Sequence, residues 1–214
     1  MRSFVLAGII CVLAGSWAEG QINSFTVSAG YSNVQISHNA GPFYSRDGGY
    51  IDGEFMWRLP EESRFPLLVG GSVSGSTYYD FEHIDVNFSD GTSGRARLES
   101  DLGFVSLEAR AALPISFGRH GGTGFFVVPK IGAGLLIDSY GIDNAYNSGG
   151  FTYLHTSYHD GAAFDIRPGI QAGYSWGWGS AGAEVSYMAG FGDFGRLGSI
   201  AQEIRAGAFF RVKF

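Results

Sequence analysis

The chain has 214 residues, of which 45% are hydrophobic, 15% aromatic and only 16% charged, with a formal net charge of −6 at pH 7. A mildly acidic chain of this kind argues against nucleic-acid binding, which needs a basic patch, so we expect no nucleic-acid partner. Glycine, with 34 residues, has about twice its usual share of roughly 7%, which favours a β protein with many close backbone approaches.

Residues 1–20 have the organisation of a secretory signal peptide. An apolar run follows a single arginine and leads into small residues, as in signal sequences. We predict cleavage after Ala18 or Gly20, which leaves residues 21–214 as one domain. An uncleaved anchor is the alternative, although the run is short for a transmembrane helix. The only cysteine, Cys11, lies in this segment, so we expect no disulfide in the mature chain.

Eight segments in which apolar and polar residues alternate follow along the chain. A period of two predicts β-strands, and each segment has about the 9–11 residues with which a tilted strand crosses a bilayer. No comparable helical periodicity competes with them. The segments cover residues 24–31, 51–59, 67–74, 105–113, 127–138, 164–174, 181–189 and 203–214.

The connections between these segments alternate in length. Short or moderate connections cover residues 60–66, 116–124 and 177–180, whereas longer polar ones cover 33–49, 79–97 and 138–161, and 192–202 is intermediate. Short turns at one end and long loops at the other are typical of outer-membrane barrels. An even number of strands places both termini at the short-turn end.

Two prolines lie inside the predicted strands. Pro129 and Pro168 interrupt otherwise regular alternation. Proline cannot donate a hydrogen bond to the neighbouring strand, so we expect a bulge or a break in the sheet at both positions.

Alternation alone does not show which face of the barrel contacts water. A soluble lipocalin-type barrel also has eight strands, with an apolar interior and a polar exterior. Here the polar face holds mainly glycine, serine and charges of both signs, which suit the narrow lumen of an eight-stranded membrane barrel. Because buried charges need partners, we predict a lumen network formed by Asp52, Glu54, Arg58, Glu108, Arg110, Lys130, Asp165, Arg167, Glu184, Glu203, Arg205, Arg211 and Lys213.

Aromatic residues gather near both ends of the predicted strands. Trp57, Trp176 and Trp178 lie towards the short turns, and Tyr78 and Tyr79 towards the long loops. Two aromatic bands are typical of the interfacial girdles of membrane barrels, so we predict that these residues form the girdles. Two aromatic clusters that cap a soluble core are the alternative.

The last segment, "AGAFFRVKF", alternates and ends in phenylalanine. It resembles the C-terminal strand of bacterial outer-membrane proteins, which in that family is recognised by the membrane insertion machinery. The resemblance makes Phe210, Val212 and Phe214 a candidate assembly signal. Over nearly the whole mature chain the pattern resembles small eight-stranded barrels, the OmpA-type membrane domain and the opacity-like proteins. This resemblance implies an all-β, eight-stranded antiparallel up-and-down transmembrane β-barrel in the bacterial outer membrane.

For such a barrel we expect a structural or surface-interaction role, with the lumen plugged by ion pairs. Its partners would be outer-membrane lipid, lipopolysaccharide, the insertion machinery and a surface ligand of unknown identity. A narrow porin-like channel is the alternative. A lipid A-modifying enzyme is a weaker candidate, because the histidines in the long connections lack a Ser-His-acid spacing: His38, His83, His155 and His159. We therefore expect no enzyme activity, no cofactor and no metal site.

Overall fold

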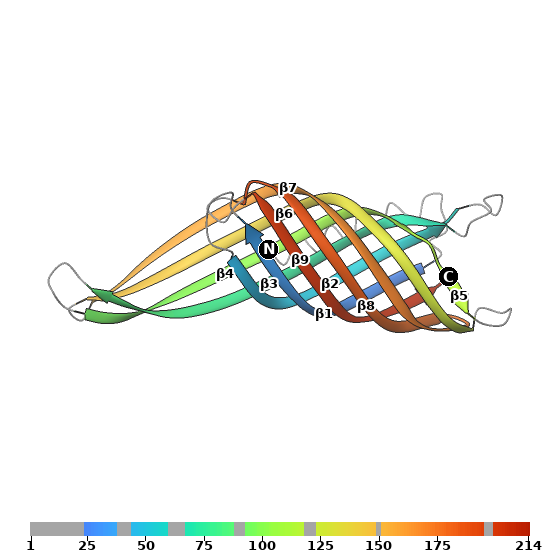
Figure 1. The fold of residues 1–214 in the computed structure, drawn as a ribbon, viewed down its shortest axis with the longest axis horizontal. Helices are drawn as coiled ribbons and strands as arrows, with labels where there is room; N and C mark the ends of the chain where they lie inside the picture. Colours follow the sequence, from blue (N-terminus) through green and yellow to red (C-terminus); the bar gives the residue numbers. More distant parts are fainter. Residues whose placement is uncertain are drawn as a thin grey trace.

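The computed structural model describes a barrel of β-strands (Figure 1). The described residues are 24–37, 44–59, 67–87, 93–117, 123–148, 151–194 and 199–214, so the predicted signal peptide lies outside them. Among these residues no helix is long and apolar enough to cross a membrane. The strands are β1 (Ser24–Ser37), β2 (Tyr44–Arg58), β3 (Leu68–Asn87), β4 (Ser93–Ala112), β5 (Ile115–Phe117), β6 (Gly124–Ser148), β7 (Phe151–Trp176), β8 (Gly179–Gly192) and β9 (Ile200–Lys213).

Antiparallel pairing closes these strands into one barrel. Each strand pairs with the next along the chain, except that β4 pairs with β6 instead of β5, and β1 pairs with β9 to close the sheet. The short strand β5 continues β4, because both pair with β6 in one register, Ala112 with Lys130 and Ile115 with Val127. The nine described segments therefore form eight barrel strands, which confirms the predicted eight-stranded antiparallel up-and-down architecture.

Both prolines interrupt the sheet, as the sequence predicts. The break between β4 and β5 lies opposite Pro129 on β6. The β7–β8 pairing stops after Ile166 and resumes at Gly169, so that Pro168 lies within the gap. In both places the missing N–H group of proline accounts for the lost hydrogen bond.

Four strands are much longer than the others. β3, β4, β6 and β7 have 20, 20, 25 and 26 residues, whereas β1, β2, β8 and β9 have 14 or 15. The long strands project from one end of the barrel as two paired hairpins, seen in green to orange in Figure 1. We call this end the hairpin end, and the opposite end, where the β7–β8 turn lies, the turn end.

The projecting hairpins correct the prediction that residues 79–97 and 138–161 are loops. Pairing continues to Asn87 and Ser93 in one hairpin and to Ser148 and Phe151 in the other. In these segments polar residues occur at both odd and even positions. The alternation expected of a strand with one apolar and one polar face is therefore weak. The backbone groups that face the partner strand are nevertheless paired within each hairpin.

The seam between β1 and β9 depends on a close backbone approach. Gly30 and Gly207 are paired across it. A Cβ atom on Gly207 would lie 2.3 Å from the Ala29 carbonyl oxygen and 2.6 Å from the Tyr50 hydroxyl. Glycine is therefore required here to let the strands and the Tyr50 side chain share the lumen.

Candidate functional site in the barrel lumen

Strand alternation places most of the predicted network residues inside the barrel. Eleven of the thirteen predicted members are at most 7% exposed: Asp52, Glu54, Glu108, Arg110, Lys130, Asp165, Arg167, Glu184, Glu203, Arg205 and Arg211. Asp138 on β6, which was not predicted, is a further buried acid and is 1% exposed. The other two predicted members lie elsewhere. Arg58 is exposed at the end of β2, and Lys213 is half-buried at the end of β9, where its ammonium group donates to the Ser175 hydroxyl.

Arg110 on β4 is one centre of this network. Its guanidinium group contacts Asp52 Oδ2 at 2.6 Å, Glu54 Oε2 at 2.9 Å and Glu108 Oε2 at 2.9 Å. The planar group carries five N–H donors in a fixed fork, which lets one arginine satisfy several carboxylates at once. Arg110 thereby joins β2 to β4 across the lumen.

Arg167 on β7 is a second centre. It lies 2.6 Å from Glu108 Oε1, 3.3 Å from Glu203 Oε2 and 3.7 Å from Asp165 Oδ2. Glu108 therefore bridges Arg110 and Arg167. Arg205 on β9 extends the network with a 2.8 Å contact to Glu203.

Lys130 on β6 connects the network to the remaining strands. Its ammonium group lies 2.7 Å from Glu184 and 3.2 Å from Glu54. Glu184 also accepts a hydrogen bond of 2.5 Å from Gln171, whose amide oxygen accepts one from Arg211. Mutual pairing offsets the desolvation that buried charges would otherwise suffer.

Two apolar clusters flank the charged layer. The cluster towards the hairpin end consists of Val34, Ile36, Tyr78, Leu102, Phe104, Leu136, Ala163, Met188, Phe194 and Ala201. The cluster towards the turn end consists of Met56, Ala112, Phe126, Val128 and Phe209. Neither cluster is among the predictions from the sequence. The sequence does hold a signal for the first cluster. In β1, Val34 and Ile36 lie two and four residues after Ser32, so the alternation places these apolar side chains on the lumen face.

Tyr78 is not part of the girdle, which corrects the prediction. Its side chain is 2% exposed and its hydroxyl donates to Glu203 inside the lumen. The next residue, Tyr79, is 52% exposed on the outside. Adjacent residues of a strand point to opposite faces, so only one of the two tyrosines can face outward.

Large apolar side chains cover much of the described exterior of the barrel. The exposed large side chains include Val27, Ile51, Leu107, Ile131, Leu135, Ile137, Phe164, Ile166, Ile170, Val185 and Ile204. At the turn end the rings of Trp176, Trp178 and Phe210 pack with centroids 5.7–6.1 Å apart. Trp57, also predicted for the girdle, is half-buried.

A polar cluster marks the outer surface beyond Tyr31 at the hairpin end. The Tyr31 hydroxyl donates to Asp47, and Asn33 donates to the same carboxylate at 2.7 Å. These two hydrogen bonds lower the pKa of the exposed Asp47 carboxyl group. The exterior thus changes from apolar to polar between Ile51 and Asp47 on β2.

The candidate assembly residues lie on the exterior of the last strand. Phe210 is 43% exposed, Phe214 is 78% exposed and Val212 is half-buried. Their strand, β9, pairs with both β1 and β8.

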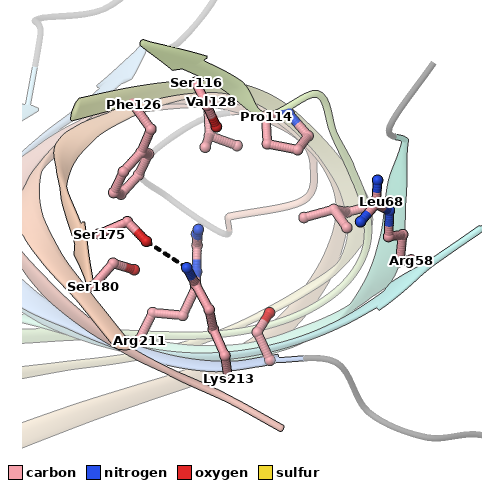
Figure 2. Close-up of a pocket in the computed structure, with 11 residues that line it drawn as sticks. Arg58, Leu68, Pro114, Ser116, Phe126, Val128, Ser175, Ser180, Arg211 and Lys213 are labelled. Atoms are coloured by element: carbon pink, nitrogen blue, oxygen red, sulfur yellow. Dashed lines mark hydrogen bonds between the residues drawn. The ribbon is translucent and has the colours of Figure 1, made fainter. Parts of the chain in front are cut away.

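A cavity of about 530 Å³ opens into the lumen at the turn end (Figure 2). We call it the vestibule. It is lined by Ser24, Arg58, Leu68, Pro114, Ser116, Phe126, Val128, Ser175, Ser180, Arg211 and Lys213. The vestibule is not among the predictions from the sequence.

The described residues hold no group of three or more His, Cys, Asp or Glu side chains placed to bind a metal ion. Of the four histidines considered for catalysis, His83 lies on β3, and His155 and His159 lie on β7. His38 lies outside the described residues.

Comparison with known proteins gives structural likeness only. No protein-family model and no curated protein matches the chain. Among solved structures, Ail of Yersinia pestis, crystallised with the heparin analogue sucrose octasulfate, is 11% identical with a TM-score of 0.46, covering 88% of this chain and 98% of that chain. Neisserial surface protein A is 18% identical with a TM-score of 0.46, covering 89% and 97%. The N-terminal β-barrel domain of Pseudomonas aeruginosa OprF is 19% identical with a TM-score of 0.34, covering 92% and 100%.

Likeness at these identities and TM-scores carries no inference about function. The fold assignment rests on the strand pairing of the chain itself.

Proposed function

We propose that this chain is a non-catalytic barrel of the bacterial outer membrane, with its exterior in lipid and its lumen sealed. The observation that carries the proposal is the distribution of side chains. Leu107, Ile131 and Phe164 are 44%, 53% and 51% exposed on the outside, whereas the paired lumen charges are at most 7% exposed. A barrel that worked in water would have the opposite arrangement.

The layers of the lumen support a plug rather than a channel. The ion pairs fill the middle, and an apolar cluster lies on either side of them. Eight strands leave room for little more than side chains, and apolar constrictions oppose the entry of water. The narrow porin-like channel is therefore the less favoured alternative.

The projecting hairpins support a role at the cell surface. They extend past the neighbouring strands β2 and β8, and their sequence is polar and aromatic. We assign contacts with lipopolysaccharide or a surface ligand to the residues of this end, among them Tyr44, Arg46, His83, Asp85, Tyr146, Tyr153 and Tyr158.

We further propose that the insertion machinery recognises Phe210, Val212 and Phe214 during assembly. Residues 1–20 are proposed to direct export of the chain. The exposed position of Phe210 and Phe214 on the closing strand supports this assignment, because an insertion factor must reach the strand before the barrel closes.

The test combines localisation, folding and conductance. The protein expressed with its own residues 1–20 should fractionate with the outer membrane and migrate differently in detergent gels before and after boiling. Purified barrels in planar bilayers should give no stable single-channel current. Identical migration together with recovery in the soluble fraction would contradict the membrane assignment. A stable current that Arg110→Glu alters would favour the channel.

A further inference from the structure

The vestibule has two unlike walls. Figure 2 shows Phe126, Val128 and Pro114 on one side, and Ser175, Ser180, Arg211 and Lys213 on the other. Its volume of about 530 Å³ lies within the roughly 300–1,000 Å³ that small-molecule sites occupy. The space is thus large enough for a small ligand with an apolar part and a polar part.

The described charged residues that line the vestibule all have the same sign. They are Arg58, Arg211 and Lys213, and none of the described lining residues is acidic. In the charged network next to the vestibule, Arg110, Lys130, Arg167 and Arg205 each have a carboxylate within 2.8 Å. The contact of Arg211 with Glu54 is 3.9 Å long, so Arg211 and Lys213 are the described lumen cations with the weakest ion pairing.

Lys213 is the more weakly paired of these two cations. Among the described residues its ammonium group forms no ion pair, and its hydrogen-bond partner is the Ser175 hydroxyl. An ammonium group has three N–H donors, so two remain for a ligand or solvent. The side chain is half-buried, where an anion is attracted more strongly than in open water.

We propose that the vestibule binds an organic anion, with a carboxylate or phosphate head at Lys213 and Arg211 and an apolar body against Phe126, Val128 and Pro114. Lys213 donates to the head group as a charge-assisted hydrogen bond. Burial of the apolar body against Phe126 supplies the remaining affinity. The site lies at the opposite end of the barrel from the projecting hairpins and is independent of their role.

The binding test uses the full chain in nanodiscs of a zwitterionic phospholipid, with empty nanodiscs as the reference for partitioning. The probes are 2-naphthoate, 1-naphthyl phosphate and the neutral 2-naphthalenemethanol, titrated by calorimetry at low salt. We expect saturable binding of at least one anion. The neutral alcohol should bind more weakly by a factor of about ten or more, because it lacks a charged acceptor. The ratio of the two anions identifies the preferred head group.

Three variants separate the site from general surface charge. Lys213→Gln should weaken anion binding about tenfold, and Lys213→Arg should retain it. Arg97→Gln removes the same charge from β4, outside the vestibule lining, and should leave binding unchanged. Each variant is first checked for the folded form in unboiled gels.

Three results would overturn the proposal. These are the absence of saturable anion binding, equal affinity for the neutral alcohol, and unchanged affinity in folded Lys213→Gln. None of them bears on fractionation or heat-modifiability, so a failure here remains distinguishable from a failure of the membrane assignment.

Discussion

Glu108 shows how a single side chain connects the charged layer. Its two carboxylate oxygens contact different arginines, Arg110 at 2.9 Å and Arg167 at 2.6 Å, and Ser106 donates to it at 2.9 Å. A Cβ atom on the facing Gly132 would lie 2.3 Å from Oε2 of Glu108. Residues of β4 and β7 therefore provide the hydrogen-bond partners of Glu108, and the missing side chain of Gly132 on β6 leaves room for its carboxylate.

We predict that Glu108→Gln destabilises the barrel by about 3 kcal/mol, because removal of one partner leaves buried arginine charge less compensated. The free energy of unfolding in guanidinium chloride, measured in phospholipid vesicles, tests this expectation. Asp101→Asn, an exposed position on the same strand, is the matched control and should change stability by less than about 1 kcal/mol. Equal effects of the two substitutions would contradict a structural role of the lumen network.

At the scale of elements, the β1–β9 seam decides whether the barrel closes. Its pairing runs without a gap from Ser24 and Lys213 to Ser37 and Ile200. Closure leaves no unpaired edge along the barrel wall, and in lipid every backbone polar group needs an internal partner. A local clash at the seam therefore affects the whole barrel.

Gly207→Val should weaken closure, because its new side chain would meet the Ala29 carbonyl and the Tyr50 hydroxyl. We expect a loss of about 3 kcal/mol, at the upper end of the range for overpacked sites, and less folded protein in unboiled gels. Ala208→Val adds the same bulk at the adjacent, outward-facing position and should fold normally. A normal yield of folded Gly207→Val would show that the seam tolerates a wider spacing.

At the scale of the whole molecule, the barrel is inverted relative to a protein that folds in water. Its charges lie along the axis and its aliphatic side chains lie outside. The two ends differ as well, since polar groups such as Asp47 and the projecting hairpins lie at one end and the vestibule at the other. This asymmetry suits a protein with a fixed orientation in a membrane.

Leu135→Arg tests this inversion. Leu135 is 46% exposed among other aliphatic residues, and an arginine near the middle of a bilayer costs about 2–4 kcal/mol, against about 0–1 kcal/mol near an interface. Phe117→Arg, on the exposed β5 strand at the turn end, should therefore be nearly neutral. Unfolding free energies in phospholipid vesicles provide the comparison. If both substitutions are neutral, the outside of the barrel does not face acyl chains.

The sequence by itself determined the eight barrel strands, their inward and outward faces and the interruptions at Pro129 and Pro168. The physical reason is that a strand has a period of two and that lipid and a narrow lumen demand opposite chemistry on its two faces. Proline acts locally through its missing N–H group. These features need no knowledge of which strands are neighbours.

Only the tertiary structure decided which charges meet, that apolar clusters flank them, and that residues 79–87, 93–97, 138–148 and 151–161 continue as paired strands. Contacts such as Arg110 with Asp52 join residues far apart in the chain, and they depend on register and closure, which a period of two leaves open. The inward position of Tyr78 and the gathering of Arg58, Arg211 and Lys213 around one cavity follow from the same closure.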